Sequence, residues 1–289
     1  MTTRRAMVAG SLLAASAVLA GCVGTGTRDD DLQNQLADLE RRHGGRLGVA
    51  VLDTATKRLV SRRGNERFAL CSTFKMLAVG YVLARVDRGE ESLDRRIVYG
   101  GDYLVDYSPI TEKHVGAGLT VREICEAAVT LSDNSAANLL LDSFGGPSAL
   151  TAYLSGLGDH VTRLDRRELE LNDVKPDDPR DTTSPRAMIG LMQSLLLGPA
   201  LSPPLRGQLT TWLVESKTGY QRLRAGIPAD WRVGDKTGTG PGRETNDVAI
   251  IWPRGRSPLL VAAYYAESVG SAAEREMVLA DVGRLAVTI

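Results

Sequence analysis

The chain has 289 residues, of which 43% are hydrophobic, so it can bury the core of one large domain or of two closely packed ones. Its 35 basic residues balance its 35 acidic ones, and no basic run alternates with aromatic residues, which gives no sign of nucleic-acid binding. The three histidines are widely spaced and none is near a cysteine, so we expect neither a metal site nor another cofactor.

The N-terminal segment has the pattern of an export signal. Arg4 and Arg5 precede a small, apolar run that is too short for a stable transmembrane helix and ends in Leu19-Ala20-Gly21-Cys22. We assign residues 1–21 to a signal peptide that is removed.

The end of this signal predicts how the protein is held at the cell envelope. Its last four residues resemble a bacterial lipobox, in which Cys22 is lipidated, and the two arginines resemble a Tat signal, although a Sec signal can also carry two arginines. We expect an exported protein, either lipid-anchored through Cys22 at the outer face of the membrane or secreted, with residues 22–31 as a short tether.

A surface helix and a β-hairpin are predicted next. Leucines at 32, 36 and 39 among polar residues predict a helix over 31–42, which two glycines end. The segments Leu47–Leu52 and Arg58–Val60 are joined by a polar stretch and predict two antiparallel strands.

From Ser72 onward the hydrophobic pattern is helical. Thr120 and Glu123 form a capping box, and Ser184 followed by Pro185 is an N-cap with proline at the first helical position. The predicted helices cover Ser72–Arg88, Val121–Leu131, Ala136–Ser143, a segment opened by Pro147, Arg186–Leu197 and a segment from Pro203 to near Ser216.

After Trp231 the hydrophobic period changes to two. Trp231–Thr237, Asn246–Trp252 and Leu259–Ala266 predict three strands, and Glu274–Ala286 predicts a final amphipathic helix.

These elements predict an α+β fold with an antiparallel sheet and an inserted all-α domain. Residues 32–66 and 218–289 form the sheet domain with its N- and C-terminal helices, and residues 67–217 form the helical domain. The first and last helices are expected to pack together on one face of the sheet. A cleft between the two domains is the expected place for a site.

A serine and a lysine lie three residues apart where a loop becomes a helix, in Cys71-Ser72-Thr73-Phe74-Lys75. On a helix, positions i and i+3 are neighbours, so the hydroxyl of Ser72 and the amine of Lys75 can meet. At a helix N-terminus the dipole also favours negative charge on the attacking oxygen, which makes Ser72 a candidate nucleophile. A serine and a lysine at this spacing also arise by chance, so the motif alone does not establish Ser72 as a nucleophile.

Two further clusters carry polar residues in turns. Ser132-Asp133-Asn134 lies in the break between two predicted helices and is by itself an ordinary turn. Lys236-Thr237-Gly238-Thr239-Gly240 ends a predicted strand, where glycine lets a ligand or backbone approach closely. Because a strand follows rather than a helix, a nucleotide-binding loop is excluded.

The three motifs S-x-x-K, S-D-N and K-T-G, in this order, resemble those of the penicillin-recognising serine enzymes, among them class A serine β-lactamases. Residues 166–172 and 179–183 resemble the omega loop of class A β-lactamases, with Glu168 and Asn172 at the positions that hold the hydrolytic water. The spacings also match that family: 57 residues from Lys75 to Ser132, 36 from Ser132 to Glu168 and 68 from Glu168 to Lys236.

The resemblance implies a β-lactamase/transpeptidase-like fold and hydrolysis of penicillins and cephalosporins. Ser72 would form the acyl-enzyme, and Glu168, with Asn172, would activate the water that releases it. Lys75, or Glu168 through a water, would deprotonate Ser72, and this choice stays open. We expect the like charge of Lys236 to lower the pKa of Lys75.

The family pattern also implies the substrate-binding residues. Ser132 would relay a proton to the leaving nitrogen, and Asn134 would contact the side-chain amide of the substrate. The pocket for the substrate carboxylate would be formed by Lys236, Thr237, Gly238, Thr239 and Arg222, with Tyr107 at the rim of the cleft. Two alternatives stay open: Arg222 as a solvated surface residue, and Tyr107 as a loop residue packed on the core.

Some positions depart from the family pattern. Leu169 follows the loop glutamate, where many members have a proline in a cis peptide bond. The carbapenemase subgroup has a cysteine partner for Cys71 at the position where this chain has Gly240. Cys71 and Cys125 could pair in an oxidising compartment, but Cys71 adjoins Ser72 and Cys125 lies in a different predicted helix, so we expect two buried free thiols.

Two other functions remain as alternatives: a D-Ala-D-Ala peptidase, and a non-catalytic β-lactam sensor. Glu168 with Asn172 argues against the first, because a peptidase keeps its acyl-enzyme. The expected partner is a small-molecule β-lactam, and we expect a monomer.

Overall fold

The computed structural model describes residue 2, residues 26–175 and residues 177–289. Apart from residue 2, the predicted signal peptide lies outside the described residues, as do Cys22 and the first part of the tether. None of the helices in the described part is both long enough and apolar enough to cross a membrane.

The first helix, α1 (Gly26–His43), begins earlier than predicted, so residues 26–31, which we assigned to the tether, are helical. The leucine pattern shows only where a helix packs against a core, whereas helical hydrogen bonding continues into polar sequence. Asp31 accepts a hydrogen bond from the Gln35 side-chain amide one turn later, at 2.9 Å.

A five-stranded antiparallel sheet forms the centre of the fold, in the order β2-β1-β9-β8-β7. The strands are β1 (Arg46–Asp53), β2 (Leu59–Arg62), β7 (Arg232–Thr239), β8 (Thr245–Trp252) and β9 (Leu259–Ala266). All five predicted strands are therefore present, and the α+β fold class is confirmed. Because β7 lies at one edge, its K-T-G segment has one open side.

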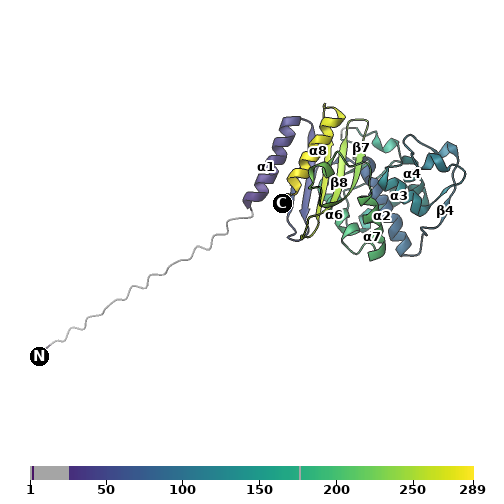
Figure 1. Ribbon diagram of the computed structural model, residues 1–289, viewed down its shortest axis with the longest axis horizontal. Helices are drawn as coiled ribbons and strands as arrows, with labels where there is room; N and C mark the ends of the chain where they lie inside the picture. The colour runs from purple at the N-terminus through teal and green to yellow at the C-terminus, as the bar shows by residue number, and fades with distance from the viewer. Residues whose placement is uncertain (1, 3–25, 176) are drawn as a thin grey trace.

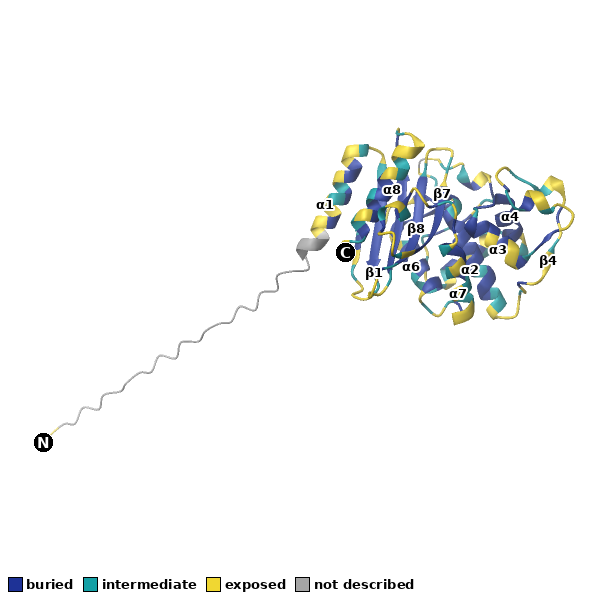
Figure 2. Cartoon of the chain, viewed as in Figure 1, coloured by how far each residue is buried: buried dark blue, intermediate teal, exposed yellow. Residues whose placement is uncertain are grey.

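The alternation of side chains along the strands divides the core into two layers. Val261 and Ala263 of β9 pack with α1 and the last helix, α8 (Ala272–Ala286). Leu260 and Ala262 belong to the other layer, together with the helical part of the chain. This confirms that the first and last helices pack on one face of the sheet, and Figure 2 shows the strands buried between the layers.

The helical part lies beside the β7 edge and on the second sheet face (Figure 1). Its capping signals behave as predicted: Thr120 and Glu123 form a capping box, and the Ser184 hydroxyl accepts from the Ala187 N–H. The helices are α2 (Phe74–Asp87), α3 (Val121–Thr130), α4 (Asn134–Ser143), α5 (Pro147–Gly156), α6 (Pro185–Leu196) and α7 (Pro203–Val214). The 3-10 turns are η1 (Cys71–Thr73), η2 (Gly101–Tyr103), η3 (Thr111–His114), η4 (Glu170–Asn172) and η5 (Leu223–Gly226).

The prediction that residues 67–217 are all-α was wrong in detail. Two short ladders occur there, β3 (Phe68–Ala69) with β6 (Thr182–Thr183) and β4 (Arg96–Ile97) with β5 (Leu119–Thr120). Strands of two residues are too short to show an alternating hydrophobic pattern, so the sequence could not reveal them. The boundaries that we drew at 66 and 217 stay predictions.

Candidate active site

Ser72 lies in the 3-10 turn η1, directly before α2. The Thr73 side chain holds this turn, since its hydroxyl donates to the Leu70 carbonyl at 2.6 Å. Cys71 has φ 42°, in the left-handed region that side chains rarely adopt. The sequence prediction that Ser72 lies at the start of a long helix is confirmed.

The β7 edge approaches this turn closely at Gly238. A Cβ at Gly238 would lie 3.1 Å from the Leu70 carbonyl oxygen and 3.2 Å from the Ser72 nitrogen. A side chain there would push the strand away from the nucleophile, which explains the glycine in K-T-G.

A cleft of about 660 Å³ opens between the β7 edge and the helical part. Nine of the twelve predicted site residues line it, and Lys75, Glu168 and Lys236 are buried beside it. The nine are Ser72, Tyr107, Ser132, Asn134, Asn172, Arg222, Thr237, Gly238 and Thr239. The structure therefore brings together all the motifs that the sequence singled out.

Lys75 is fully buried, and its ammonium group is surrounded by acceptors. Its Nζ donates to the Ser132 carbonyl at 2.8 Å and to Asn134 Oδ1 at 2.5 Å, and it forms an ion pair with Glu168 Oε1 at 3.1 Å. Ser132 Oγ is a fourth, more distant acceptor at 3.4 Å, and these acceptors suit the charged form, which has three N–H donors.

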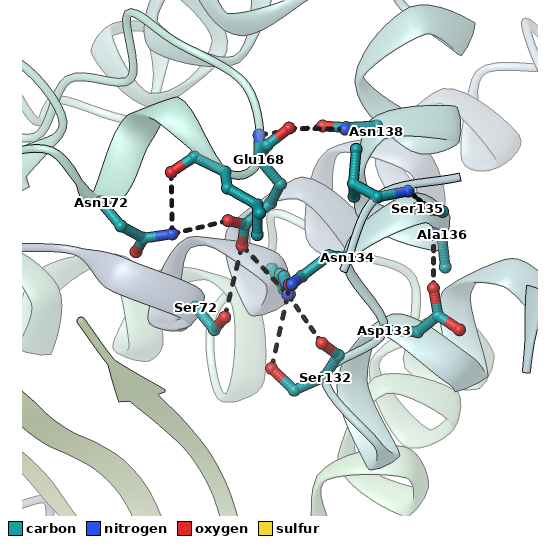
Figure 3. Close-up of polar contacts among 12 residues, drawn as sticks. Ser72, Ser132, Asp133, Asn134, Ser135, Ala136, Asn138, Glu168 and Asn172 are labelled. Atoms are coloured by element: carbon teal, nitrogen blue, oxygen red, sulfur yellow. Dashed lines mark hydrogen bonds and ion pairs between the residues drawn. The ribbon is translucent and has the colours of Figure 1, made fainter. Parts of the chain in front are cut away.

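Glu168 is the residue where the motifs converge. The Ser72 hydroxyl donates to its Oε1 at 3.4 Å, rather than to Lys75, and the Asn172 side-chain amide donates to its Oε2 at 2.8 Å (Figure 3). The Glu168 side chain is 1% exposed, so the carboxylate is screened little by solvent. The peptide bond between Glu168 and Leu169 is cis.

The hydroxyl of Ser132 accepts hydrogen bonds from both lysines. Lys236 Nζ donates to it at 3.0 Å and Lys75 Nζ at 3.4 Å. The backbone of Ser132 has φ 60°, so this serine also lies in the left-handed region. With its oxygen accepting on two sides, the hydroxyl proton is free to point into the cleft.

Burial lowers the pKa of both lysines. For Lys75 burial is the largest effect, and the Glu168 carboxylate opposes it. The pKa of Lys236 lies well below its ordinary value because of burial and, next, the positive charge of Lys75. Our prediction of a lowered pKa for Lys75 is confirmed in its direction, but burial rather than the like charge of Lys236 is the largest cause, and burial cannot be read from the motif spacing.

Arg222 lies behind the edge of β7 and is 7% exposed. Its Nη1 donates to the Gly238 and Asn246 carbonyls at 2.8 and 2.9 Å, and its Nη2 donates to Thr239 Oγ1 at 2.7 Å. The alternative of a solvated surface arginine is wrong. The positive charge is instead held against the K-T-G strand.

Tyr107 is 60% exposed and lines the cleft, so the alternative of packing on the core is also wrong. Its backbone has φ 61°, and its carbonyl accepts from the Asn134 N–H at 3.0 Å. The rim of the cleft is thereby tied to the S-D-N motif.

The ends of the omega loop (residues 166–183) are joined by the buried Asp181. Its Oδ2 accepts from Arg166 Nε at 2.6 Å, and its Oδ1 accepts from the Asp165 and Arg166 N–H groups at 2.7 and 2.9 Å. Its carbonyl accepts from the Leu70 N–H at 2.8 Å, just before the nucleophile turn. The pairing that we predicted between Arg166 and Asp181 is confirmed.

Under the acyl-enzyme mechanism that the resemblance implies, replacing Asp181 by asparagine is expected to slow release of the acyl group from Ser72 about tenfold, which corresponds to about 1.4 kcal/mol in the barrier. The asparagine would turn an NH₂ donor toward the Arg166 guanidinium and loosen the loop that carries Glu168. The decay of the acyl-enzyme, followed by intact mass, measures this rate. Asp173→Asn, at an exposed position of the same loop, is the control, and equal decay in both variants would contradict the positioning role of Asp181.

The sequence reasoning missed several residues of the site. Asn138 holds the Glu168 backbone: its Oδ1 accepts from the Glu168 N–H at 3.0 Å, and its Nδ2 donates to the Glu168 carbonyl at 2.9 Å (Figure 3). Asn138 lies four residues after Asn134, so the helical period could have identified it. The other missed residues line the cleft: Leu169, Lys217, Thr218 and Pro241.

The two cysteines of the described part are free and buried, as expected. Burial raises the pKa of the Cys71 thiol well above its ordinary value, so this neighbour of Ser72 stays protonated and unreactive.

A serine at a helix N-terminus, two buried lysines and a buried carboxylate around one cleft define a serine enzyme of the acyl-transfer class. The comparisons with known proteins narrow this class. The profile of the beta-lactamase enzyme family matches residues 31–289. The chain therefore belongs to this family, and the relatives described next identify it as a class A β-lactamase, a hydrolase of β-lactams.

Three relatives illustrate the similarity. Beta-lactamase OXY-1 of Klebsiella oxytoca is 45% identical over 89% of this chain and 88% of that protein. Carbapenem-hydrolyzing beta-lactamase KPC of Klebsiella oxytoca is 48% identical over 87% of this chain and 86% of that protein. The solved structure of an ancestral class A β-lactamase, GNCA, is 64% identical, covers 89% of this chain and 99% of its own, and superposes with a TM-score of 0.88.

Proposed function

We propose that this enzyme hydrolyses penicillins and cephalosporins through an acyl-enzyme on Ser72, which a water activated by Glu168 releases. One observation carries the proposal: a single buried carboxylate contacts the nucleophile, the buried lysine and the Asn172 amide.

In the acylation step the proton of Ser72 is transferred to the pair formed by Lys75 and Glu168. Glu168 Oε1 lies within 3.4 Å of Ser72 Oγ and 3.1 Å of Lys75 Nζ, so it can receive a proton from either. When Lys75 gives a proton to Glu168, the neutral amine becomes a base, and its lowered pKa favours that form.

The oxyanion and the leaving nitrogen need separate donors. We assign the oxyanion to the backbone N–H groups of Ser72 and Thr239, each typically worth about 3 kcal/mol. Ser132 accepts from Lys75 and Lys236, so its own proton is available to the lactam nitrogen, and the lysines can replace it.

The substrate carboxylate fits the β7 side of the cleft. Lys236, Thr237, Gly238 and Thr239 present donors along the strand edge, and the charge of Arg222 lies directly behind Thr239. Asn134 and Tyr107, on the opposite wall, are placed for the side chain of the substrate.

In the deacylation step Glu168 takes a proton from water as that water attacks the ester. The Asn172 amide nitrogen fixes Oε2, and its oxygen is a buried acceptor without a partner among the described residues. Asn172 and Glu168 can therefore hold a water between them, near Ser72.

We also propose that the chain is exported and either anchored through a lipid on Cys22 or secreted. The support is the arginine pair, the short apolar run and the lipobox-like Leu19-Ala20-Gly21-Cys22 in the sequence. Fractionation of cells that make the full chain tests this, since a wholly cytoplasmic protein would contradict it.

The test is to mix the purified protein with benzylpenicillin and follow lactam absorbance together with intact mass. We expect rapid loss of absorbance with a transient adduct on Ser72. A persistent one-to-one adduct would instead indicate a D-Ala-D-Ala peptidase or a β-lactam sensor. With no adduct and no turnover, the assignment of Ser72 as nucleophile would be wrong.

A further inference from the structure

One face of α4 carries three polar residues at successive helical turns: Asn134, Asn138 and Asp142. Asn134 accepts from Lys75, and Asn138 bonds both backbone groups of Glu168. Asp142, one turn further on, accepts from Arg167 Nη2 at 2.9 Å. The same helix face thus contacts two consecutive residues of the omega loop, Arg167 and Glu168.

Arg167 is held by a closed set of three interactions. Its Nη2 donates to the Tyr103 hydroxyl at 2.7 Å as well as to Asp142, and the Tyr103 hydroxyl donates to Asp142 Oδ2 at 2.6 Å. The guanidinium carbon also lies 5.7 Å from the centre of the Tyr103 ring. We call these three residues the Arg167 clasp.

The clasp joins three segments that are distant in sequence. Tyr103 ends η2, four residues before Tyr107 at the rim of the cleft, while Asp142 belongs to α4 and Arg167 to the omega loop. Burial and the hydrogen bond to Asp142 raise the pKa of Tyr103, so its hydroxyl remains a donor.

We propose that the Arg167 clasp positions Glu168 for deacylation. The two bonds from Asn138 hold the Glu168 backbone, and Asp181 holds the backbone of Arg166. The clasp fixes Arg167, which lies between these two residues, to the same face of α4 through its side chain. The Glu168 carboxylate then keeps its place between Ser72 and Asn172. This inference rests on the proposed function of Glu168.

The expected effect is moderate because the clasp is partly exposed. The side chains of Arg167 and Asp142 are 42% and 44% exposed. We expect Arg167→Gln to slow the decay of the Ser72 acyl-enzyme about fivefold, the scale on which partly exposed ion-pair networks act.

The experiment compares acyl-enzyme decay after benzylpenicillin addition, at a temperature where every variant is folded. Tyr103→Phe removes only one hydroxyl, so we expect it to slow acyl-enzyme decay less than Arg167→Gln does. Arg167→Lys keeps the charge opposite Asp142, so we expect it to restore part of the decay rate that Arg167→Gln loses. Adding Asp142→Asn to Arg167→Gln is expected to cause little further loss, since both residues act in one unit. Arg180→Gln is the matched control, because this arginine of the same loop has a similarly exposed side chain and pairs only with Asp178 within the described part.

Decay at the wild-type rate in Arg167→Gln would overturn the inference, as would an equal slowing in Arg180→Gln. Independent, additive losses from Arg167→Gln and Asp142→Asn would also overturn it. These outcomes are distinct from failure of the proposed function, in which the unmodified protein itself would form no transient adduct.

Discussion

Replacing Glu168 by glutamine is expected to leave the enzyme acylated on Ser72 and to lower turnover of benzylpenicillin about 10²–10⁴-fold, the usual contribution of a general base. The amide keeps the size of the side chain but cannot take a proton from water. Acylation continues, because Lys75 remains next to the serine and loses the carboxylate that raises its pKa. Intact mass should show the adduct persisting for many turnover times of the unmodified enzyme.

Glu170→Gln is the matched control for this variant. Glu170 lies two residues further along the same loop and is exposed, so its change should leave turnover unaltered. If Glu168→Gln turned over benzylpenicillin at the rate of this control, the general-base role of Glu168 would be refuted.

Lys75→Met is expected to slow the earlier step, the acylation of Ser72. Methionine fills a similar volume, but it leaves Glu168 as a buried carboxylate without its counter-ion, an arrangement that typically costs about 3–5 kcal/mol. Within the pair, only Glu168 then remains as an acceptor for the Ser72 proton, and the amine that we propose as the base is absent. We expect acylation to slow about 10²–10⁴-fold, so that no adduct accumulates on the time scale on which Glu168→Gln is fully acylated.

Stopped-flow acylation with benzylpenicillin separates the two variants, and Lys113→Met, at an exposed lysine of η3, is the control. Acylation of Lys75→Met at a rate close to that of the control would mean that the proton of Ser72 leaves by another route. The melting temperature should be measured in parallel, since the unpaired carboxylate also destabilises the fold.

The sequence predicted the strands and helices well because their signals are local. The capping box at Thr120, the proline after Ser184 and the unbroken apolar run of β9 each identify an element without knowledge of its neighbours. The two-residue ladder between β3 and β6 has no such signal, because it depends on where a distant segment crosses.

The sequence predicted those site residues that belong to motifs with a recognisable order and spacing. The convergence of Ser72, Lys75 and Glu168 follows from those motifs, whereas the contacts of Asn138 and Arg167 depend on how the omega loop lies on α4. The charge state of a buried group is a property of its surroundings. For that reason the cause of the lowered pKa of Lys75 emerged only from the structure.

The order of strands in the sheet also constrains how the chain reaches its native state. β1, made early, pairs with β9, which is almost the last element to be synthesised, and the register joins Arg46 to Ala266. During synthesis the apolar β1 has only its hairpin partner β2, and a lone two-stranded hairpin is marginally stable. The sheet closes only when the C-terminal strands arrive, so folding is dominated by contacts between distant parts of the chain and is expected to be slow. A nascent or truncated chain that ends before β9 presents an uncovered strand edge, the kind of surface on which chaperones act and from which aggregation begins.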